Sequence, residues 1–309
     1  MKLEGMCMRA LLIGIFRSLR SLLARSVVFI LNAFPPSVGG VVRNIRYGRE
    51  SSQQALDIVI PRGDPPFPVL VFVHGGGFHG KDKREYSYMV GRFAREGFVV
   101  FNINYRLAPR YKFPCAFQDV SRAIRWAYDN AGRYGGDGRR MFLAGDSTGA
   151  ALTSMYAEAI QSRELMTSLS IEEGIPPEHL RGLLLFYGSY DIETVLETDF
   201  PMIEEVCHSY FGSDPQVYKA RAEIASPIRH VTKSFPPALL ISGEKDSLHS
   251  QSVAFERVLT EAGVPHRALL FSREEYPLAQ HGHGFVSFPF LRCARIAMKE
   301  AYAFLDELR

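Results

Sequence analysis

The chain of 309 residues is poor in the features that define several large classes of protein. Its four cysteines form no Cys-x-x-Cys pair and are widely separated: Cys7, Cys115, Cys207 and Cys293. A disulfide framework or a zinc site is therefore not indicated, and we expect reduced, packed thiols. No uninterrupted apolar run approaches the roughly 20 residues that a membrane-spanning helix needs.

The excess of one sign of charge is also small, because the formal net charge is only +3. Most of the excess lies in the first 25 residues, where five cationic side chains face one carboxylate. The rest of the chain is near neutral, and no basic surface for a nucleic-acid partner is indicated. With 47% hydrophobic residues, the chain can bury a large core in one α/β domain with a smaller lid.

The N-terminal segment carries an amphipathic pattern. Apolar residues recur at helical spacing, with arginines between them, at Leu12, Ile15, Leu19 and Leu22. The pattern predicts a helix that packs on the body, and we expect residues 1–45 to form N-terminal cap helices. Weak contact of residues 1–30 with a membrane surface and a cleaved signal peptide are the alternatives. We expect a cytoplasmic protein, with secretion or peripheral membrane association as the other locations.

The rest of the chain alternates strand-like and helical patterns. Short apolar runs predict strands at 54–60, 69–73, 98–103, 141–145, 183–187, 238–242 and 268–271. Helical patterns occupy 85–96, 119–131, 252–262 and 291–308. The alternation predicts an α/β fold with a mostly parallel central sheet flanked by helices. Because aromatic and acidic residues interrupt it, we expect a cap insertion at 192–235 and a catalytic domain at 46–191 and 236–309.

The most informative motif is Gly145-Asp146-Ser147-Thr148-Gly149, which follows an apolar run and precedes a helix with a small-residue start. Strand, Gly-x-Ser-x-Gly and helix in that order are typical of a nucleophile elbow, which exposes the serine hydroxyl at the carboxyl edge of a sheet. Glycines two positions either side of Ser147 let the strand and the helix approach closely. The motif also occurs by chance at ordinary turns, so its interpretation depends on the rest of the chain.

A run of three glycines follows the predicted strand at 69–73, in His74-Gly75-Gly76-Gly77-Phe78. Such a run allows backbone N–H groups to point into a site, as an oxyanion hole requires. A flexible loop or a phosphate cradle is the alternative, but the chain lacks Gly-x-x-x-x-Gly-Lys-Ser/Thr. Together with Ser147, the run predicts an oxyanion hole.

A serine nucleophile needs a base, and two histidines follow the last predicted strand. His281 and His283 stand in Gln280-His-Gly-His-Gly-Phe285, ahead of the C-terminal helix. Either could serve as the base at this stage. A metal site formed by the pair is not favoured, because no carboxylates lie near them.

The base in turn needs a carboxylate that orients it. Asp246 follows the predicted strand at 238–242 and so lies at the same sheet edge as Ser147. Asp191 is a second candidate, and Glu244 is a third that we expect to be structural. With Asp246, the chain order of nucleophile, acid and histidine is that of the α/β-hydrolases.

With these motifs, the sequence resembles a known family. This family is the hormone-sensitive-lipase-like (bacterial class IV) esterases of the α/β-hydrolase superfamily, which are related to arylacetamide deacetylases. The matching motifs run in family order from about residue 55 to residue 290: His74-Gly-Gly-Gly-Phe78, Asn104-Tyr-Arg-Leu-Ala-Pro109, Tyr134-Gly-Gly-Asp137, Gly145-Asp-Ser-Thr-Gly149, Ser226-Pro227, Gly243-Glu-Lys-Asp246 and His283-Gly-Phe285. Two positions depart from the family pattern. Thr148 replaces the usual alanine, and Ser247 replaces a frequent proline.

The resemblance implies a role for each matching residue. Ser147 would be the nucleophile, Asp246 the acid, and His283, which precedes Gly-Phe, the base. Backbone N–H groups of Gly76, Gly77 and Thr148 would form the oxyanion hole. The implied activity is hydrolysis of short- to medium-chain acyl esters through an acyl-enzyme, on a small-molecule substrate and without cofactor or metal.

Two other functions are compatible with the same motifs. One is an amidase or arylacetamide-deacetylase-like hydrolase, which the elbow does not distinguish from an esterase. The other is a non-catalytic ligand receptor on the same scaffold, which the presence of His283 disfavours. A homodimer is compatible with the sequence.

Overall fold

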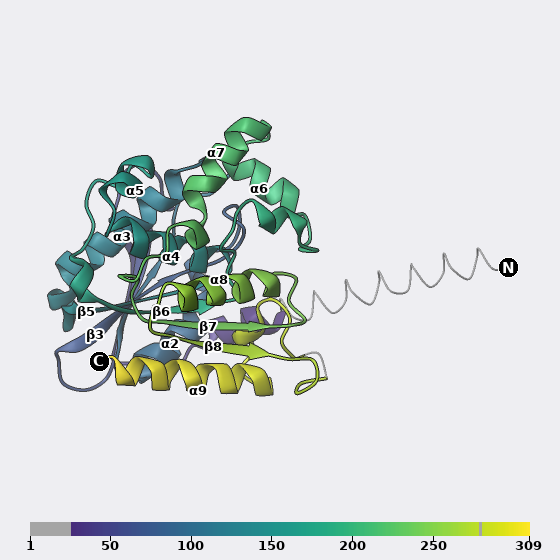
Figure 1. Cartoon of the computed structure of the whole chain (residues 1–309). Coiled ribbons are helices and arrows are strands. Elements are labelled where there is room, and N and C mark those ends of the chain that lie inside the picture. The colour runs from purple at the N-terminus through teal and green to yellow at the C-terminus, as the bar shows by residue number, and fades with distance from the viewer. Residues whose placement is uncertain (1–25, 278–279) are drawn as a thin grey trace.

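The computed structural model describes residues 26–277 and 280–309, and the predicted helix around Leu12 to Leu22 lies outside them. An eight-stranded sheet crosses the described part of the chain in the order β1-β2-β4-β3-β5-β6-β7-β8 (Figure 1). The strands are β1 (Gly40–Arg46), β2 (Ala55–Ile60), β3 (Phe67–Val73), β4 (Val99–Ile103), β5 (Gly136–Asp146), β6 (Leu180–Phe186), β7 (Ala238–Gly243) and β8 (His266–Phe271). Only the β1–β2 and β2–β4 pairs are antiparallel. The predicted mostly parallel sheet is confirmed.

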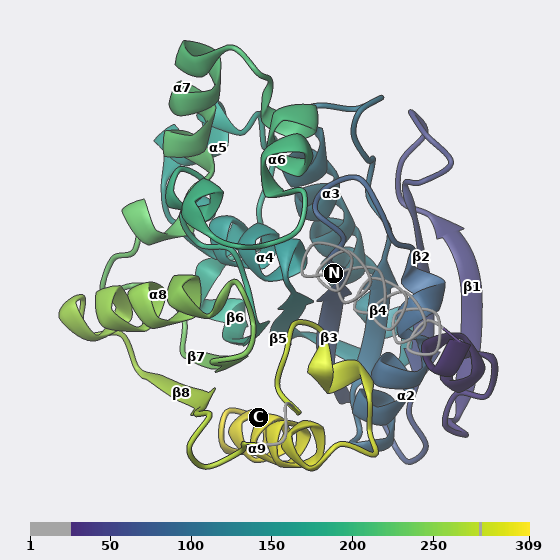
Figure 2. The same cartoon turned by 90° about the vertical axis from the view of Figure 1, so that its right-hand side faces the viewer.

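Helices cover both faces of this sheet. One face carries α2 (Ser87–Arg95) and α9 (Arg292–Glu307), and the other carries α3 (Cys115–Asn130), α4 (Thr148–Ala159) and α8 (His249–Glu261) (Figures 1 and 2). Three further helices lie on the α4 side of the sheet: α5 (Arg163–Ser168), α6 (Ile203–Phe211) and α7 (Pro215–Ala225). The predicted α/β-hydrolase architecture therefore has its two helical layers.

Alternation along the strands creates two cores. In β3, Val69, Val71 and Val73 pack toward α3 and α4, whereas Leu70 and Phe72 pack toward α2 and α9. Successive side chains of a strand point to opposite faces, so a strand buried on both faces is apolar throughout.

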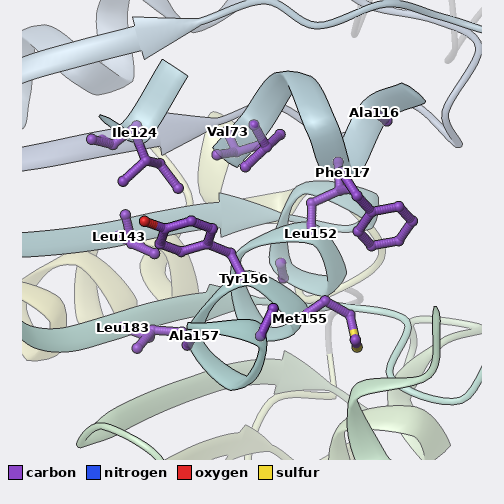
Figure 3. Packing of buried hydrophobic residues seen from close by; sticks show 14 of the residues in the cluster. Val73, Ala116, Phe117, Ile124, Leu143, Leu152, Met155, Tyr156, Ala157 and Leu183 are labelled. Carbon is purple, nitrogen blue, oxygen red and sulfur yellow. The ribbon is translucent and has the colours of Figure 1, made fainter. Parts of the chain in front are cut away.

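Helix α4 is held tightly against the sheet. All twelve of its residues are buried. Figure 3 shows Leu152 and Tyr156 of α4 packed with Val73, Leu143 and other side chains of the first core. Each such buried side chain contributes about 1.5–3 kcal/mol. The start of α4, where Ser147 lies, is therefore fixed by packing along the whole helix.

The N-terminal boundary differs from the sequence-based expectation. The expected end of the N-terminal cap at residue 45 falls within β1, so the sheet begins at Gly40 and only residues 26–33 of the described N-terminal segment are helical. Strand β1 lies at the sheet edge and is largely exposed, so its sequence lacks the apolar run of a buried strand. No helix among the described residues is long and apolar enough to cross a membrane.

The segment predicted as a cap insertion lies between β6 and β7. It contains the short turn η4 (Thr194–Glu197), helices α6 and α7, and the turn η5 (Pro227–Arg229). These elements add no strand to the sheet.

Candidate active site

Ser147 lies at the sharp turn between β5 and α4. Its backbone adopts φ 53° and ψ −121°, a left-handed φ that few non-glycine residues accept. The turn is tight, because a Cβ at Gly149 would lie 2.0 Å from the Val73 carbonyl oxygen. The Ser147 N–H donates to the Phe186 carbonyl oxygen at 2.8 Å, which ties the turn to β6. The geometry of a nucleophile elbow is thus present.

Three predicted side chains form one hydrogen-bonded chain at this turn. His283 Nε2 lies 3.0 Å from Ser147 Oγ. On the other side of the ring, His283 Nδ1 lies 3.0 and 2.9 Å from the two carboxylate oxygens of Asp246. Asp246 is buried and also accepts the Leu248 N–H at 2.9 Å. A serine, an imidazole and an oriented carboxylate in this order can transfer the serine proton to the imidazole.

Aromatic rings confine the imidazole of His283. The Tyr187 ring centroid lies 5.0 Å from that of His283, and the Phe200 ring centroid lies 4.9 Å away, both edge-on. Tyr187 follows β6, whereas Phe200 belongs to the segment between β6 and β7. Motif reasoning did not identify these two residues, because neither belongs to a motif named above.

The structure separates the two candidate histidines. His281 is fully buried. Its Nδ1 accepts the Lys245 N–H at 3.3 Å, and its Nε2 lies 3.1 Å from the Tyr276 carbonyl oxygen, to which it donates in the neutral form. Both ring nitrogens therefore hold the loops after β7 and β8 together, and only His283 reaches Ser147.

The alternative acids have other partners. Asp191 accepts the Glu193 N–H at 3.0 Å and lies 3.8 Å from an Arg229 guanidinium nitrogen. Glu244 accepts the Arg273 N–H across the β7–β8 edge. Only Asp246, of the three candidate acids, contacts the His283 ring.

The three-glycine loop is anchored by the residue before the serine. The Gly75 N–H donates to Asp146 Oδ1 at 2.7 Å, and the Tyr86 hydroxyl donates to Asp146 Oδ2 at 2.9 Å. Burial raises the pKa of the Asp146 carboxyl. This role of Asp146 was not predicted, because the motif leaves that position unspecified and its partners lie 60 and 71 positions away.

The buried side chain of His74 stabilises the start of the same loop. Its ring is fully buried and stacks on the Tyr105 ring with centroids 4.4 Å apart. Burial lowers the pKa of His74 to about 4, so the imidazole is neutral near pH 7. The Tyr105 hydroxyl donates to the His74 carbonyl oxygen at 2.9 Å. His74 therefore has a structural role in the loop, and it is not a candidate for the base that activates Ser147.

The three expected oxyanion donors differ in their present partners. Gly76 (φ +113°) and Gly77 (φ +64°) have the backbone freedom that the loop needs. The Gly77 N–H donates to Thr148 Oγ1 at 3.0 Å. Within residues 26–277 and 280–309, the Gly76 N–H has no hydrogen-bond acceptor. The Thr148 N–H lies in the first turn of α4, where the helix itself supplies no hydrogen-bond acceptor.

The Thr148 hydroxyl leads to a prediction about turnover. Thr148→Val keeps the side-chain shape but turns a methyl group toward the Gly77 N–H, whereas Thr148→Ala leaves that N–H free for substrate. Removing one oxyanion donor typically lowers kcat about 10²–10³-fold. We expect kcat for p-nitrophenyl butyrate to be about 10²-fold lower in Thr148→Val than in wild type. In Thr148→Ala we expect kcat to be roughly tenfold higher than in Thr148→Val. Equal kcat values in the two variants would contradict this account of the hole.

The segment between β6 and β7 packs directly on the glycine loop. The Phe78 ring stacks on the Tyr210 ring of α6 with centroids 4.2 Å apart and an interplanar angle of 3°. A Cβ at Gly77 would lie 2.7 Å from Val206 Cγ1 of the same helix. Helix α6 therefore forms one wall beside the expected oxyanion hole.

Other motif residues have structural partners. Arg106 is buried and forms an ion pair at 2.8 Å with Asp119, which is also buried. Asp137 pairs with Arg140 at 3.1 Å, and the Ser226 hydroxyl accepts the Ile192 N–H at 2.8 Å. No cluster of three or more His, Cys, Asp or Glu side chains suited to a metal ion occurs in the described part of the chain.

The chain is similar to a known family and to characterised esterases. The BD-FAE family model matches residues 56–259. Esterase LipQ of Mycobacterium tuberculosis is 32% identical over 248 residues, which cover 77% of this chain and 56% of that protein. Ethyl acetate hydrolase of Pseudomonas putida is 30% identical over 213 residues, which cover 66% of this chain and 64% of that protein. The chain spans about half the length of LipQ and of two further mycobacterial esterases that it matches, LipC and LipM.

Solved structures share the fold over nearly the whole chain. Esterase B of Lactobacillus rhamnosis superposes with a TM-score of 0.77 at 23% identity, covering 97% of this chain and 96% of the other. The Pyrobaculum calidifontis esterase has a TM-score of 0.74 at 25% identity, covering 94% and 93%. The family model covers well over half of the chain. The protein therefore belongs to the BD-FAE family, and its expected place among the hormone-sensitive-lipase-like esterases of the α/β-hydrolase superfamily is confirmed.

Proposed function

We propose that the protein is a serine carboxylester hydrolase that acts on short- to medium-chain acyl esters. The observation that carries the proposal is the unbroken chain from Ser147 Oγ through the His283 ring to the Asp246 carboxylate. It lies beside the Gly76–Gly77 loop and the start of α4, whose N–H groups would donate to a developing oxyanion once the Gly77 N–H leaves Thr148 Oγ1. The esterase names of the relatives support the same activity.

The reaction follows from the roles of these groups. Ser147 Oγ attacks the ester carbonyl carbon while His283 Nε2 takes its proton, and Asp246 stabilises the resulting imidazolium. N–H groups of Gly76, Gly77 and Thr148 stabilise the negative charge on the carbonyl oxygen. His283 then returns the proton to the departing alcohol, which leaves Ser147 acylated. Water then attacks the acyl carbonyl carbon while His283 Nε2 takes its proton. As the bond from the acyl carbon to Ser147 Oγ breaks, His283 returns that proton to Oγ, and the carboxylic acid leaves.

The segment at 192–235 is proposed to act as a cap that limits the acyl chain. Val206 stands against Gly77 on one side of the site, and Phe200 stands against His283 on the other. Bulky side chains at both positions narrow the space around the reacting carbonyl. A relative named ethyl acetate hydrolase supports a preference for short esters.

Turnover of p-nitrophenyl esters with acyl chains from two to sixteen carbons tests the proposal. We expect hydrolysis that depends on Ser147 and that peaks at short chains, because the cap leaves little room beyond the carbonyl. Folded Ser147→Ala protein serves as the control for background hydrolysis. A rate maximum at the longest chains would contradict the cap, and p-nitroanilide turnover exceeding ester turnover would favour the amidase.

A further inference from the structure

The loop that carries His283 contributes little to fixing its side chain. Glycines flank the residue on both sides, and Gly284 has a left-handed φ of +81°. Among the described residues other than chain neighbours, no atom lies within 4 Å of where a Cβ at Gly284 would be. At Gly282 only the Lys245 carbonyl oxygen does so, at 3.7 Å. Since the side chain of His283 is itself 27% exposed, the orientation of its imidazole depends on the groups that touch the ring.

The groups around the ring come from different parts of the chain. Asp246, just past β7, accepts the Nδ1 hydrogen bond, which fixes one edge of the imidazole. Tyr187, just past β6, is buried, and its N–H donates to the Ile241 carbonyl oxygen at 2.7 Å, so its position is set by the sheet. Phe200 belongs instead to the segment at 192–235, and its ring packs edge-on against the imidazole at an interplanar angle of 78°. The sheet and this segment therefore bound the base together.

Phe200 is held at the start of α6 by a strained turn. The Ile203 N–H donates to the Phe200 carbonyl oxygen at 3.2 Å, and the Val206 N–H donates to the Met202 carbonyl oxygen at 2.9 Å. Met202 adopts φ 58° and ψ 25°, a left-handed conformation that few non-glycine residues accept. Met202 is 62% exposed, so burial of its side chain does not explain this conformation. Strained backbone of this kind concentrates at functional sites, where the surrounding structure holds it in place.

Helix α6 is in turn fixed to the body beside the glycine loop. The Phe113 N–H donates to the Tyr210 carbonyl oxygen at 3.0 Å, and the Tyr210 hydroxyl accepts the Ala116 N–H, also at 3.0 Å. The ring of Tyr210 stacks on that of Phe78, which ends the glycine loop. The helix therefore fixes Phe200, at its start, relative to the catalytic groups.

We propose that Phe200 is a positioning residue for the base, and that it holds the His283 imidazole with Nε2 toward Ser147 Oγ and Nδ1 toward Asp246. The inference rests on the proposed roles of those three residues. Phe200 acts through His283 and takes no proton itself. Without its ring, the imidazole can turn toward the vacated space, so a smaller fraction of molecules presents Nε2 to the serine. The segment at 192–235 then supports proton transfer in addition to bordering the site.

Kinetics of Phe200 variants with p-nitrophenyl acetate, which has the shortest acyl chain of the series, test this role. We expect Phe200→Ala to have a kcat about 10- to 30-fold below wild type and a KM within about threefold, because orientation of the base is lost and not substrate binding. Phe200→Tyr keeps the ring and should stay within about twofold of wild type. Met202→Ala removes an exposed side chain from the same turn and is the matched control, also expected within about twofold. A loss in Phe200→Ala carried by KM alone would contradict the proposal.

A spectroscopic measurement without substrate separates positioning of the base from contact with the ester. The proton that His283 Nδ1 shares with Asp246 gives a low-field proton NMR signal while the hydrogen bond is held, and its absence from His283→Ala assigns it. We expect the signal in wild type, Phe200→Tyr and Met202→Ala. In Phe200→Ala it should be broadened or lost, because a ring that turns exposes the proton to exchange with water. A sharp wild-type signal in folded Phe200→Ala would overturn the proposal, whatever its kcat.

Thermal unfolding reports whether each variant is folded. If Phe200→Ala does not fold, Phe200→Leu, which keeps most of the apolar volume but not the planar ring, decides the question. Its kcat should be about 3- to 10-fold below wild type, with a broadened signal, and wild-type values of both would overturn the proposal. If the wild-type protein hydrolyses no ester, the proposed function fails, but the NMR comparison still decides whether Phe200 holds His283.

Discussion

Ser147→Ala is expected to lower kcat for p-nitrophenyl butyrate by about 10⁴-fold or more while the protein remains folded. Without Oγ the ester carbonyl has no nucleophile to form the acyl-enzyme. The fold should survive, because the elbow is held by the Ser147 N–H bond to Phe186 and by the close approach at Gly149, neither of which involves the hydroxyl. Steady-state kinetics and thermal unfolding of both proteins measure the two effects.

The same experiment has an internal test of mechanism. Because Ser147 and His283 act as a unit across their 3.0 Å contact, His283→Ala and the double variant should be about as slow as Ser147→Ala alone. A fluorophosphonate should phosphonylate Ser147 of the wild-type protein with loss of HF, which mass spectrometry detects, and should leave Ser147→Ala unlabelled. Losses that multiply in the double variant, or labelling of Ser147→Ala, would show that the nucleophile is another residue.

Asp246→Asn should lower kcat by about 10⁴-fold. The carboxylate receives His283 Nδ1–H at 2.9 Å and the Leu248 N–H at 2.9 Å. An amide can satisfy the Leu248 N–H with its oxygen only by turning its NH₂ group toward the imidazole. The ring would then present the wrong tautomer to Ser147, and the imidazolium formed in the reaction would lose its counter-charge. Kinetics of the purified variant at pH 7 measure the loss.

Asp191→Asn is the matched control for this substitution. Asp191 also follows a strand at the same sheet edge, but its side chain accepts the Glu193 N–H at 3.0 Å and lies near Arg229. An amide oxygen can replace the first contact, and the 3.8 Å approach to a half-exposed guanidinium contributes little. We expect kcat within a few-fold of wild type. A loss in Asp191→Asn comparable to that in Asp246→Asn would move the acid to the earlier strand.

Much of the fold was accessible from local patterns. Buried parallel strands are continuous apolar runs, so the runs at 69–73 and 183–187 were placed within a few residues of β3 and β6. Strand β1 was missed, because an exposed edge strand has little apolar signal. The helix predicted around Leu12 to Leu22 lies outside the described residues.

The sequence by itself determined which residue types could do the chemistry. The elbow around Ser147 and the loop around Gly76 demand backbone shapes that glycine spacing reveals, and the order of strands placed Asp246 at the same edge. These are local requirements of the chain, readable within a few residues. They do not determine which side chains come into contact when loops that are distant in the sequence fold together.

Only the tertiary structure determined those contacts. His281 and His283 stand two positions apart, yet packing buries the first between loops and presents the second to Ser147, 136 positions away. The bond from Gly77 to the Thr148 hydroxyl joins residues 71 positions apart. Such contacts depend on how whole helices and strands pack, because the side-chain positions are set by the three-dimensional arrangement and not by neighbours in the chain.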